Sequence, residues 1–556
     1  MQIVIPMSGF GERFRNAGYK VPKPLILVEG KPIIEHVVDM FPGETDIIFI
    51  CNKDHLSDLS FSLQKTLFDI CPTGRIVAVD AHKLGPVHAI QKAEHLLDMT
   101  QPVVVNYCDF SCYWDWADFR EFVTKTNCKG AIPAYKGFHP HSLGNTNYAY
   151  MKESDGRVSD IQEKLPYTNN RMEEFASSGT YYFATADLMS KAFKYVVERE
   201  LSVNSEFYVS LAYKYLLETS QSTLVYPLQH FMQWGTPADV KEYNYWSQAF
   251  KGLIKPIALD ASPNGSFIVP MAGLGKRFSD QGYLKVKPLI AVSGRCMVLQ
   301  ASNDLPATKN QVFVLRSDMS GFEEVSSELQ NYHPGCIIKV VDGVTDGQAI
   351  TARIGLEALT EHGQGFGPVT FGACDNGALY DIEGFNALLN DPQTDILVWC
   401  VRGYANAVRK PEMFGWVDAG PNGLINQISV KTPLDDPSMD PIVIGTFTFK
   451  KGRDFSLALD RLIERNGLVN GEFYIDSLIN DAIELGLRCK VFEVDSYLCW
   501  GTPDDLRTFE YWQSCFHKWP SHPYRIELDA RVPEDAVHEL SEIYKPWKIV
   551  ENNSGD

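Results

Sequence analysis

Apolar residues in the first part of the chain gather in short runs that alternate with longer amphipathic stretches. Four runs are rich in β-branched residues, have the length of a strand and stop at turn or polar residues: Gln2–Pro6, Asp46–Cys51, Arg75–Val79 and Pro102–Asn106. The stretches Leu56–Phe68 and His88–Met99, which lie between these runs, are helix-like. This alternation predicts an α/β fold with a mostly parallel sheet and helices on both faces. Ligands of such sheets bind beyond the carboxyl ends of the strands.

The same pattern returns in the second half of the chain. IVIPMSGFGERF (3–14) is matched by IVPMAGLGKRF (268–278), and GYKVPKPLILVEGKP (18–32) by GYLKVKPLIAVSGRC (282–296). NSEFYVSLAYKYLL (204–217) is matched by NGEFYIDSLINDAI (470–483), and QWGTPADVKEYNYW (233–246) by CWGTPDDLRTFEYW (499–512). Four matches in one order, at separations of 264 (273 − 9) to 266 (375 − 109) residues, predict two tandem domains.

The repeat sets the expected domain boundaries. The first copy should occupy residues 1–250 and the second copy residues 266–515, joined by a linker at 251–265 that contains Pro, Gly, Ser and Asn. Residues 516–556 have no counterpart and are predicted to form a C-terminal tail that ends in the polar sequence ENNSGD. A chain of 556 residues would otherwise suggest three or four domains, at about 100–200 residues each.

The charge and the cysteine content limit the classes of partner and the compartment that fit this chain. With 51 basic and 70 acidic residues, a net charge of −19 disfavours a broad binder of nucleic acid or of anionic membranes. No apolar run approaches the ~18 residues of a membrane span, and the N-terminus lacks a signal-peptide pattern. The twelve cysteines form no CxxC pair, so we expect reduced thiols in a cytoplasmic protein. A homo-oligomer is compatible with these features.

A glycine-rich loop follows the first predicted strand. Gly9 and Gly11 would let backbone N–H groups approach an anion, and Arg13 adds a charged fork for phosphate oxygens. Lys23 stands ten residues later between two prolines, which fix the direction of the ammonium group. The loop lacks the spacing of a P-loop or of a dinucleotide fingerprint, so a single copy would indicate a phosphate site only weakly. Because the loop recurs in the second copy, it indicates a phosphate site strongly. Its counterparts in the second copy are Gly273, Gly275, Arg277 and Lys287.

These motifs resemble the signature of the nucleotidyltransferases that make nucleotide sugars, the sugar-phosphate pyrophosphorylases. The form of the loop with Pro6-Met7-Ser8-Gly9 resembles members from bacterial capsule and surface-polysaccharide synthesis. The resemblance covers nearly all of both copies. It implies two Rossmann-like domains of the GT-A type that join an NTP to a sugar 1-phosphate, or to a related phosphorylated small molecule, and release pyrophosphate.

The resemblance also assigns roles to individual residues. It implies that Gly9, Gly11 and Arg13 hold the β,γ-phosphates, that Lys23 neutralises the α-phosphate, and that Asp109 binds Mg²⁺. The implied acceptor-side residues are Glu163, Lys164, Gly179 and Glu206. The matching residues of the second copy are Gly273, Gly275, Arg277, Lys287, Asp375, Lys431, Gly445 and Glu472. Simpler interpretations are a turn at Asp109, a solvated Glu163-Lys164 pair and a helix-start carboxylate at Glu206.

The sequence departs from the family pattern at the second metal carboxylate, where Gln233 and Cys499 stand. Cysteine suits Mg²⁺ badly, and Asp239 is interpreted as part of a helix start after Thr236. In the second copy Val430 also replaces the Glu of the Glu-Lys pair. That copy therefore has a different acceptor, or it is an idle, sensing or scaffolding domain.

Two other classes of function stay open. A GT-A glycosyltransferase would share the fold, but such enzymes usually carry Asp-x-Asp where this chain has Asp109-Phe110-Ser111. A regulatory or scaffold protein would bind an NTP without releasing pyrophosphate. The residues leave the base of the NTP and the identity of the acceptor open.

Overall fold

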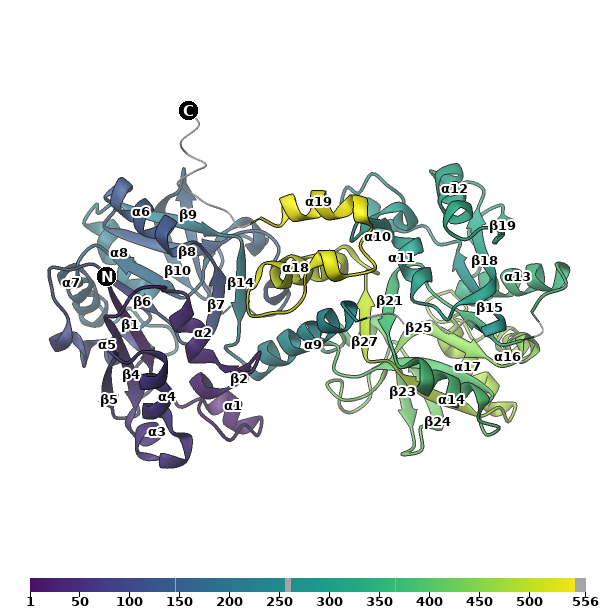
Figure 1. The fold of residues 1–556 in the computed structure, drawn as a ribbon, viewed down its shortest axis with the longest axis horizontal. Helices are drawn as coiled ribbons and strands as arrows, with labels where there is room; N and C mark the ends of the chain where they lie inside the picture. Colours follow the sequence, from purple (N-terminus) through teal and green to yellow (C-terminus); the bar gives the residue numbers. More distant parts are fainter. Residues whose placement is uncertain (146, 256–261, 366, 546–556) are drawn as a thin grey trace. The chain divides into compact units, whose positions relative to one another are not determined.

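The computed structural model describes residues 1–145, 147–255, 262–365 and 367–545 (Figure 1). They fall into two compact units, one formed mainly by Met1–Asn244 and the other by Tyr245–Tyr544. The division lies inside helix α9 (Pro237–Leu253), six residues before the predicted end of the first copy. Of the predicted linker, residues 251–253 end this helix, residues 256–261 lie outside the described part of the chain, and β15 begins at Ser262.

The first unit is built on a sheet of strand order β11-β9-β10-β13-β8-β12-β6-β1-β4-β5. Its strands are β1 (Gln2–Met7), β4 (Ile47–Asn52), β5 (Arg75–Val79), β6 (Val103–Asn106), β8 (Gly130–Tyr135), β9 (Ala149–Ser154), β10 (Arg157–Glu163), β11 (Phe175–Ser177), β12 (Thr180–Phe183) and β13 (Thr223–Leu228). The four strands predicted from the sequence are confirmed as β1, β4, β5 and β6, and they lie together at one end of the order.

The prediction of a mostly parallel sheet is wrong. Pairing is parallel among β5, β4, β1 and β6 and between β13 and β8. The other pairings within this sheet are antiparallel. One of the antiparallel pairings has a local cause: β9 and β10 are joined by a tight turn at Asp155-Gly156, where both residues have positive φ, and such a hairpin forces its strands to run in opposite directions.

Helices cover both faces of this sheet. α5 (Pro86–Gln91), α7 (Ala186–Glu198) and α8 (Val209–Glu218) bury apolar side chains in one core with Val105, Tyr181 and Val225. Because neighbouring residues of a strand face opposite sides, Tyr182 and Tyr226 point away from that core and pack against Phe119 of α6 (Trp116–Thr126). Two helix-like stretches are broken: one becomes α3 (Lys53–Ser57) and α4 (Leu63–Ile70), the other α5 and a 3₁₀ turn at Glu94–Leu96.

The second unit repeats this strand order over its main path, β19-β18-β15-β20-β25-β22-β26, and β23 and β24 extend it. Its strands are β15 (Ser262–Met271), β18 (Thr308–Arg316), β19 (Ile337–Val341), β20 (Val369–Phe371), β22 (Ile396–Val401), β23 (Gly415–Ala419), β24 (Ile425–Val430), β25 (Ile442–Phe449) and β26 (Cys489–Glu493). Parallel and antiparallel pairings are mixed here too. The first unit runs β5-β4-β1-β6-β12-β8-β13 over the matching path.

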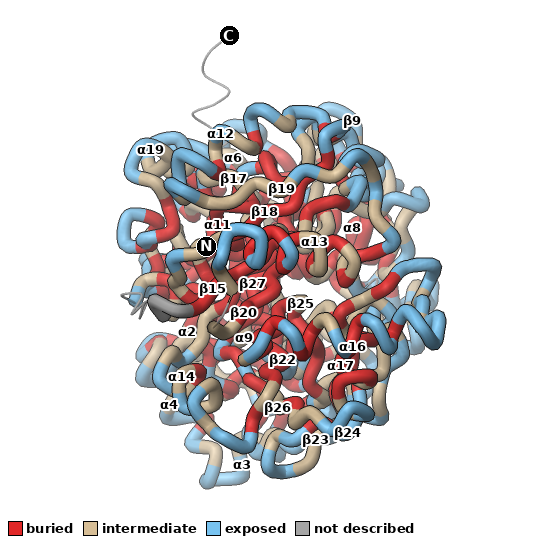
Figure 2. Tube along the Cα trace, turned by 90° about the vertical axis from the view of Figure 1, so that its right-hand side faces the viewer, coloured by how far each residue is buried: buried red, intermediate tan, exposed pale blue. Residues whose placement is uncertain are grey.

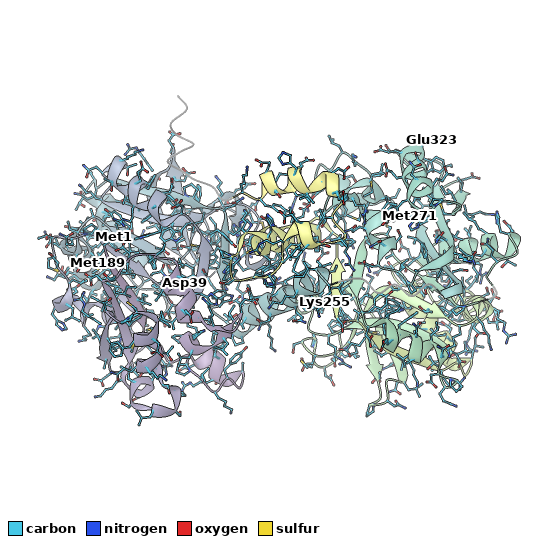
Figure 3. The ribbon with its side chains drawn as sticks, in the orientation of Figure 1. Met1, Asp39, Met189, Lys255, Met271 and Glu323 are labelled. Carbon is cyan, nitrogen blue, oxygen red and sulfur yellow. The ribbon has the colours of Figure 1, made fainter. Side chains whose placement is uncertain are left out.

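The cores of the second unit also lie on both faces of its sheet. α13 (Gln348–Glu361), α16 (Gly452–Glu464) and α17 (Ile475–Glu484) cover one face, and α11 (Met297–Asn303) and α12 (Phe322–Tyr332) cover the other. The tube in Figure 2 is red, and therefore buried, along β20 and residues 265–269 of β15. In Figure 3 Met271 marks the end of β15 and Glu323 the start of α12.

The region predicted as a tail folds as part of the second unit. α18 (Pro503–Lys518) continues past residue 515 and is followed by a 3₁₀ turn at Ile526–Leu528 and by α19 (Glu534–Ile543). Arg531 donates to Asp304 at 2.9 Å, and both side chains are almost completely buried. The terminal ENNSGD lies outside the described residues.

All twelve cysteines lie among the described residues as free thiols, nine of them buried, so no disulfide joins the described parts of either unit. Among the helices of the described residues, none is long and apolar enough to cross a membrane.

Candidate functional site

A pocket of about 480 Å³ opens at the carboxyl ends of β1 and β6 in the first unit. The predicted residues that line it are Gly9, Gly11, Arg13, Lys23, Asp109 and Glu206. They come from segments far apart in the sequence and meet because the carboxyl ends of neighbouring parallel strands share one edge of the sheet. His82 also lines this pocket, and its ring centroid lies 4.8 Å from that of His88.

The glycine loop follows β1 directly and bends at Gly11, which has φ of 63° and precedes the short helix α1 (Glu12–Asn16). This left-handed conformation favours glycine over residues with a Cβ. A Cβ built on Gly9 would have no neighbouring atom within 4 Å, so the backbone there borders open space. The loop can therefore offer N–H groups to an anion in the pocket.

Lys23 and Asp109 face each other across this pocket. The Lys23 Nζ donates to Asp109 Oδ2 at 2.8 Å, and each side chain is about a quarter exposed (25% and 27%). Burial alone would lower the pKa of Lys23, but the interactions with Asp109 and Cys108 together outweigh burial, so the pKa of Lys23 is raised. Lys23 thus stays a cation at neutral pH, ready to exchange its carboxylate partner for a phosphate.

A second pocket of about 220 Å³ adjoins the first. The two share the lining residues Arg13, Tyr107, Asp109, Tyr208 and Gly235. Glu163, Lys164 and Gly179, predicted on the acceptor side, line the smaller pocket. Because the two pockets meet at Arg13 and Asp109, two bound molecules could bring their phosphates together there.

Two sets of hydrogen bonds join residues of the smaller pocket to their neighbours. Ser210 Oγ of α8 donates to Glu163 Oε2 at 2.6 Å, Lys164 Nζ donates to the Tyr208 hydroxyl, and that hydroxyl donates to Glu206. Glu163 is 9% exposed, and burial raises its pKa to about 7. The pair Glu163-Lys164 is therefore not a solvated surface pair, and Glu206 has a side-chain partner at the pocket wall.

The donor set at Asp109 fits Mg²⁺ carried by phosphates better than a protein-only metal site. Gln233 at the end of β14 (His230–Gln233) lines the same pocket as Asp109, and its buried Oε1 has no hydrogen-bond partner. Mg²⁺ often binds one or two protein oxygens and takes its other ligands from water and substrate phosphates. The described residues contain no cluster of three His, Cys, Asp or Glu side chains able to hold a metal ion. Asp239 bonds Thr236 at the start of α9, as predicted.

The second unit contains an equivalent lysine–aspartate pair. Lys287 Nζ donates to Asp375 and to the Gly501 carbonyl oxygen, the latter at 3.1 Å. Gly275 has φ of 63°, as Gly11 has, and a Cβ on it would lie 3.2 Å from the Cβ of Lys287. Gly273, like Gly9, borders open space. The glycine loop and its lysine are thus assembled in this unit too.

Other predicted residues of the second unit gather around Tyr474. Lys431 Nζ lies 5.4 Å from the centre of the Tyr474 ring. Burial, with the Glu472 carboxylate, raises the pKa of Tyr474 to about 12, and the charge of Arg277 opposes this rise. A Cβ on Gly445 would lie 3.9 Å from Asn376 Oδ1, which immediately follows Asp375. Cys499 is buried, and burial raises its pKa well above the ordinary value, so the thiol stays protonated and a poor ligand for Mg²⁺.

Sequence reasoning missed three residues of the first unit. Tyr107 and Tyr208 line both pockets, and Ser210 bonds Glu163. A signal existed for Tyr208, because the Glu-Phe-Tyr sequence recurs around Tyr474. Ser210 carried none, since its partnership depends on how α8 packs against β10.

Comparison with known proteins supports the resemblance over the first unit. Residues 3–241 match the model of the Nucleotidyl transferase family. A mannose-1-phosphate guanyltransferase of Yarrowia lipolytica is 27% identical over 177 residues, which cover 31% of this chain and 47% of that protein. The bifunctional protein GlmU of Methanococcus vannielii is 25% identical over 181 residues, 32% of this chain and 38% of that protein.

A solved structure is also similar to part of this chain. The nucleoside-diphosphate-sugar pyrophosphorylase of Vibrio cholerae RC9 aligns with 44% of this chain and 98% of its own, with a TM-score of 0.36 and 21% identity. The chain spans about half or less of the length of the two curated relatives.

Proposed function

We propose that the first unit is a sugar-phosphate nucleotidyltransferase, which joins an NTP to a sugar 1-phosphate or a related phosphorylated small molecule. The observation that carries this proposal is the pair of adjoining pockets that meet at Arg13 and Asp109, beside the cation of Lys23. The larger pocket would take the NTP and the smaller one the acceptor. The family match of residues 3–241 supports the same reaction class.

The proposed reaction moves a nucleotidyl group between two phosphates. An oxygen of the acceptor phosphate attacks the α-phosphorus and forms a new P–O bond. The bond from this phosphorus to the oxygen that bridges to the β-phosphate breaks, and pyrophosphate leaves with that electron pair. Because the nucleophile is already an anion, no general base is needed. Catalysis then rests on positioning and on neutralising charge.

In this proposal each site residue of the first unit has one task. The N–H groups at Gly9 and Gly11, together with Arg13, hold the β,γ-phosphates, and Lys23 neutralises the α-phosphate as pyrophosphate departs. Glu163, Lys164, Gly179 and Glu206 orient the acceptor. Mg²⁺, bound with the phosphates through Asp109 and Gln233 Oε1, would neutralise further negative charge.

The second unit is proposed to be a duplicate of the first with a nucleotide site of its own. The shared strand order and the equivalent Lys287–Asp375 pair support this. Gly273, Gly275 and Arg277 would hold the nucleotide there, and Asp375 would bind Mg²⁺ without a second protein oxygen ligand at Cys499. We also propose that the enzyme is cytoplasmic and supplies capsule or surface-glycan synthesis, on the form of its Pro-Met-Ser-Gly loop.

A screen of pyrophosphate release tests the reaction. Each of five nucleotides, ATP, GTP, CTP, UTP and dTTP, is combined in turn with mannose 1-phosphate, glucose 1-phosphate and phosphoethanolamine. We expect the wild type to release pyrophosphate with at least one combination of nucleotide and acceptor, and this release should depend on Lys23. Lys23→Ala should lower the turnover of that pair by about 100-fold or more, because a cation is lost where transition-state charge develops.

A matched control is Lys191→Ala on α7, where the lysine is 57% exposed and pairs with Asp187. This variant should retain wild-type turnover. Release of a nucleoside diphosphate instead of pyrophosphate would indicate a glycosyltransferase. Binding of an NTP without any release would indicate a regulatory protein, and either result would contradict the proposal.

A further inference from the structure

Three neighbouring positions define the acceptor side of the first unit. Ala149 of β9 and Glu163 of β10 are direct partners across the antiparallel pair, and Ser210, the second residue of α8, donates to the Glu163 carboxylate. Lys164 follows with φ of 59°, and its N–H donates to the Tyr148 carbonyl oxygen at 2.8 Å. A carboxylate thus projects from the strand towards a small hydroxyl on the helix.

The same three positions exist in the second unit with different residues. Gly415 of β23 and Val430 of β24 are direct partners, and Asp476 is the second residue of α17. Lys431 also has φ of 59°, and its N–H donates to the Phe414 carbonyl oxygen at 2.9 Å. Backbone register and conformation are therefore retained, while the carboxylate has moved from the strand to the helix.

The position of the carboxylate on α17 depends on Gly415 of β23, which lies beside it. A Cβ added to Gly415 would lie 2.5 Å from Asp476 Oδ2, a distance that real Cβ atoms essentially never show, and 3.2 Å from Asp476 Cγ, which is a tight contact. An alanine at this position, as in the first unit, would therefore force the Asp476 carboxylate out of its present place. A carboxylate that only stabilised the start of α17 through the helix dipole would need no such space. The three differences are thus one coupled change that keeps a carboxylate at this site.

The surroundings of the two carboxylates correspond. Glu163, Glu206 and Arg13 all act electrostatically on the Tyr208 phenol. Asp476, Glu472 and Arg277 act in the same way on Tyr474. Asp476 also faces the positive charge of Lys431, as Glu163 faces that of Lys164. Burial raises the pKa of Asp476 to about 6, which places this carboxyl in a partly desolvated environment like that of Glu163.

We propose that Asp476 is the acceptor-binding carboxylate of the second unit and that this unit transfers a nucleotidyl group to an acceptor of its own. This inference rests on the proposed function of the first unit. The acceptor would be a phosphorylated small molecule whose hydroxyl or ammonium group donates to Asp476 while its phosphate lies near Lys431. Because the carboxylate comes from the helix and Val430 replaces Glu163, this site should prefer an acceptor other than that of the first unit.

The test uses the full-length Lys23→Ala protein, so that pyrophosphate release reports on the second unit. The NTPs named above are combined with mannose 1-phosphate and glucose 1-phosphate, which offer hydroxyl groups, and with phosphoethanolamine, which offers an ammonium group. We expect one of these two classes of acceptor, the sugar phosphates or phosphoethanolamine, to support release of pyrophosphate. Asp476→Asn should then lower kcat/KM about 10- to 100-fold through the KM for the acceptor, since a charged hydrogen-bond partner is lost, and leave the KM for the NTP within about twofold.

Two further variants separate binding from folding. Gly415→Ala should reproduce the defect, because its Cβ displaces the carboxylate, and the triple variant Gly415→Ala/Val430→Glu/Asp476→Ser should recover binding with the carboxylate on the strand. Asp460→Asn serves as the matched control, since Asp460 of α16 is 58% exposed and pairs with Arg353. It should leave release unchanged.

The outcomes divide clearly. Release by the Lys23→Ala protein that persists in Asp476→Asn would overturn the role of Asp476. If the wild type releases pyrophosphate and the Lys23→Ala protein releases none, the proposed activity of the second unit is overturned, and the proposed function of the first unit stays intact. No release by the wild type would reject both.

Discussion

Glu163 lies at the end of β10 with 9% of its surface exposed, and burial raises its pKa to about 7. Below pH 7 the group is a neutral acid, and above it is a carboxylate that accepts hydrogen bonds from an acceptor. We therefore expect kcat/KM for the acceptor to rise between pH 6 and 8. Glu163→Gln should remove this component, so that the ratio of wild-type to variant kcat/KM rises across pH 7. A ratio independent of pH would contradict the ionised role of Glu163.

The same pKa shift predicts an effect on stability. Between the ordinary pKa of 4.5 and the raised value of about 7, the folded state keeps a proton that the unfolded state has lost. The free energy of unfolding should therefore fall as pH rises through this window, by up to about 3 kcal/mol. Urea unfolding of the wild type and Glu163→Gln at pH 4.5 and 8 measures it. The stability of the wild type relative to the variant should decrease at pH 8.

Residues within local motifs could be predicted from the sequence, and residues joined by packing could not. Lys23 is fixed by the two prolines beside it, and it pairs with Asp109, which follows the end of β6. Asp476 was overlooked because its relation to Val430 depends on strand register and on where α17 begins. Alignment of the two halves alone showed that a Glu had become Val, but not that a carboxylate had returned from another element.

At the scale of elements, the loop before α5 is joined to the segment before α8. Val87 N–H donates to the Phe207 carbonyl oxygen and Phe207 N–H to that of Leu84, at 3.2 and 2.9 Å. Gly85 lies between them with φ of 86°, and a Cβ there would be 2.7 Å from the Phe207 nitrogen. Gly85→Ala should therefore force the two segments apart, lower stability by more than the ~1–3 kcal/mol that its backbone conformation alone would cost, and raise the KM for the NTP.

Gly156→Ala is the matched control for this prediction. Gly156 has φ of 74° in the turn between β9 and β10, and an added Cβ would meet nothing within 4 Å. This variant should cost about 1–2 kcal/mol for the left-handed conformation alone and leave the KM for the NTP unchanged. Denaturant unfolding and steady-state kinetics measure both effects. Equal loss of stability in the two variants, with normal NTP binding in Gly85→Ala, would contradict the joined-segment interpretation.

Elements whose boundaries are local were predicted well. β5 was predicted at its observed bounds because a β-branched run there ends at polar residues. The antiparallel half of the sheet could not be predicted, since alternation of strands and helices carries no information about direction once hairpins enter. The predicted helix at Leu56–Phe68 breaks before α4 because Ser62 adopts φ of 49°, a conformation that a helix does not contain.

At the scale of the whole molecule, the repeat predicted two domains, and two compact units are observed. Residues 516–556 were predicted as a C-terminal tail because they have no counterpart in the repeat, but the lack of a counterpart says nothing about packing, and residues 516–544 belong to the second compact unit. Tyr524 and Ile526 are fully buried, and Gln513 of α18 donates to the Tyr524 hydroxyl at 2.8 Å. The segment is therefore an additional part of the second unit.

This docking predicts that Arg531 is essential for the stability of the second unit. Arg531→Met would leave Asp304 buried at 2% exposure without its cation, and loss of one partner of a buried pair costs about 3–5 kcal/mol. Arg402→Met is the control, because Arg402 and Glu493 are 41% and 50% exposed and such pairs contribute about 1 kcal/mol or less. Hydrogen exchange should show faster opening of β15 and β20 in Arg531→Met, while pyrophosphate release that depends on Lys23 continues. Unchanged exchange in these strands would mean that the C-terminal segment covers the unit without stabilising it.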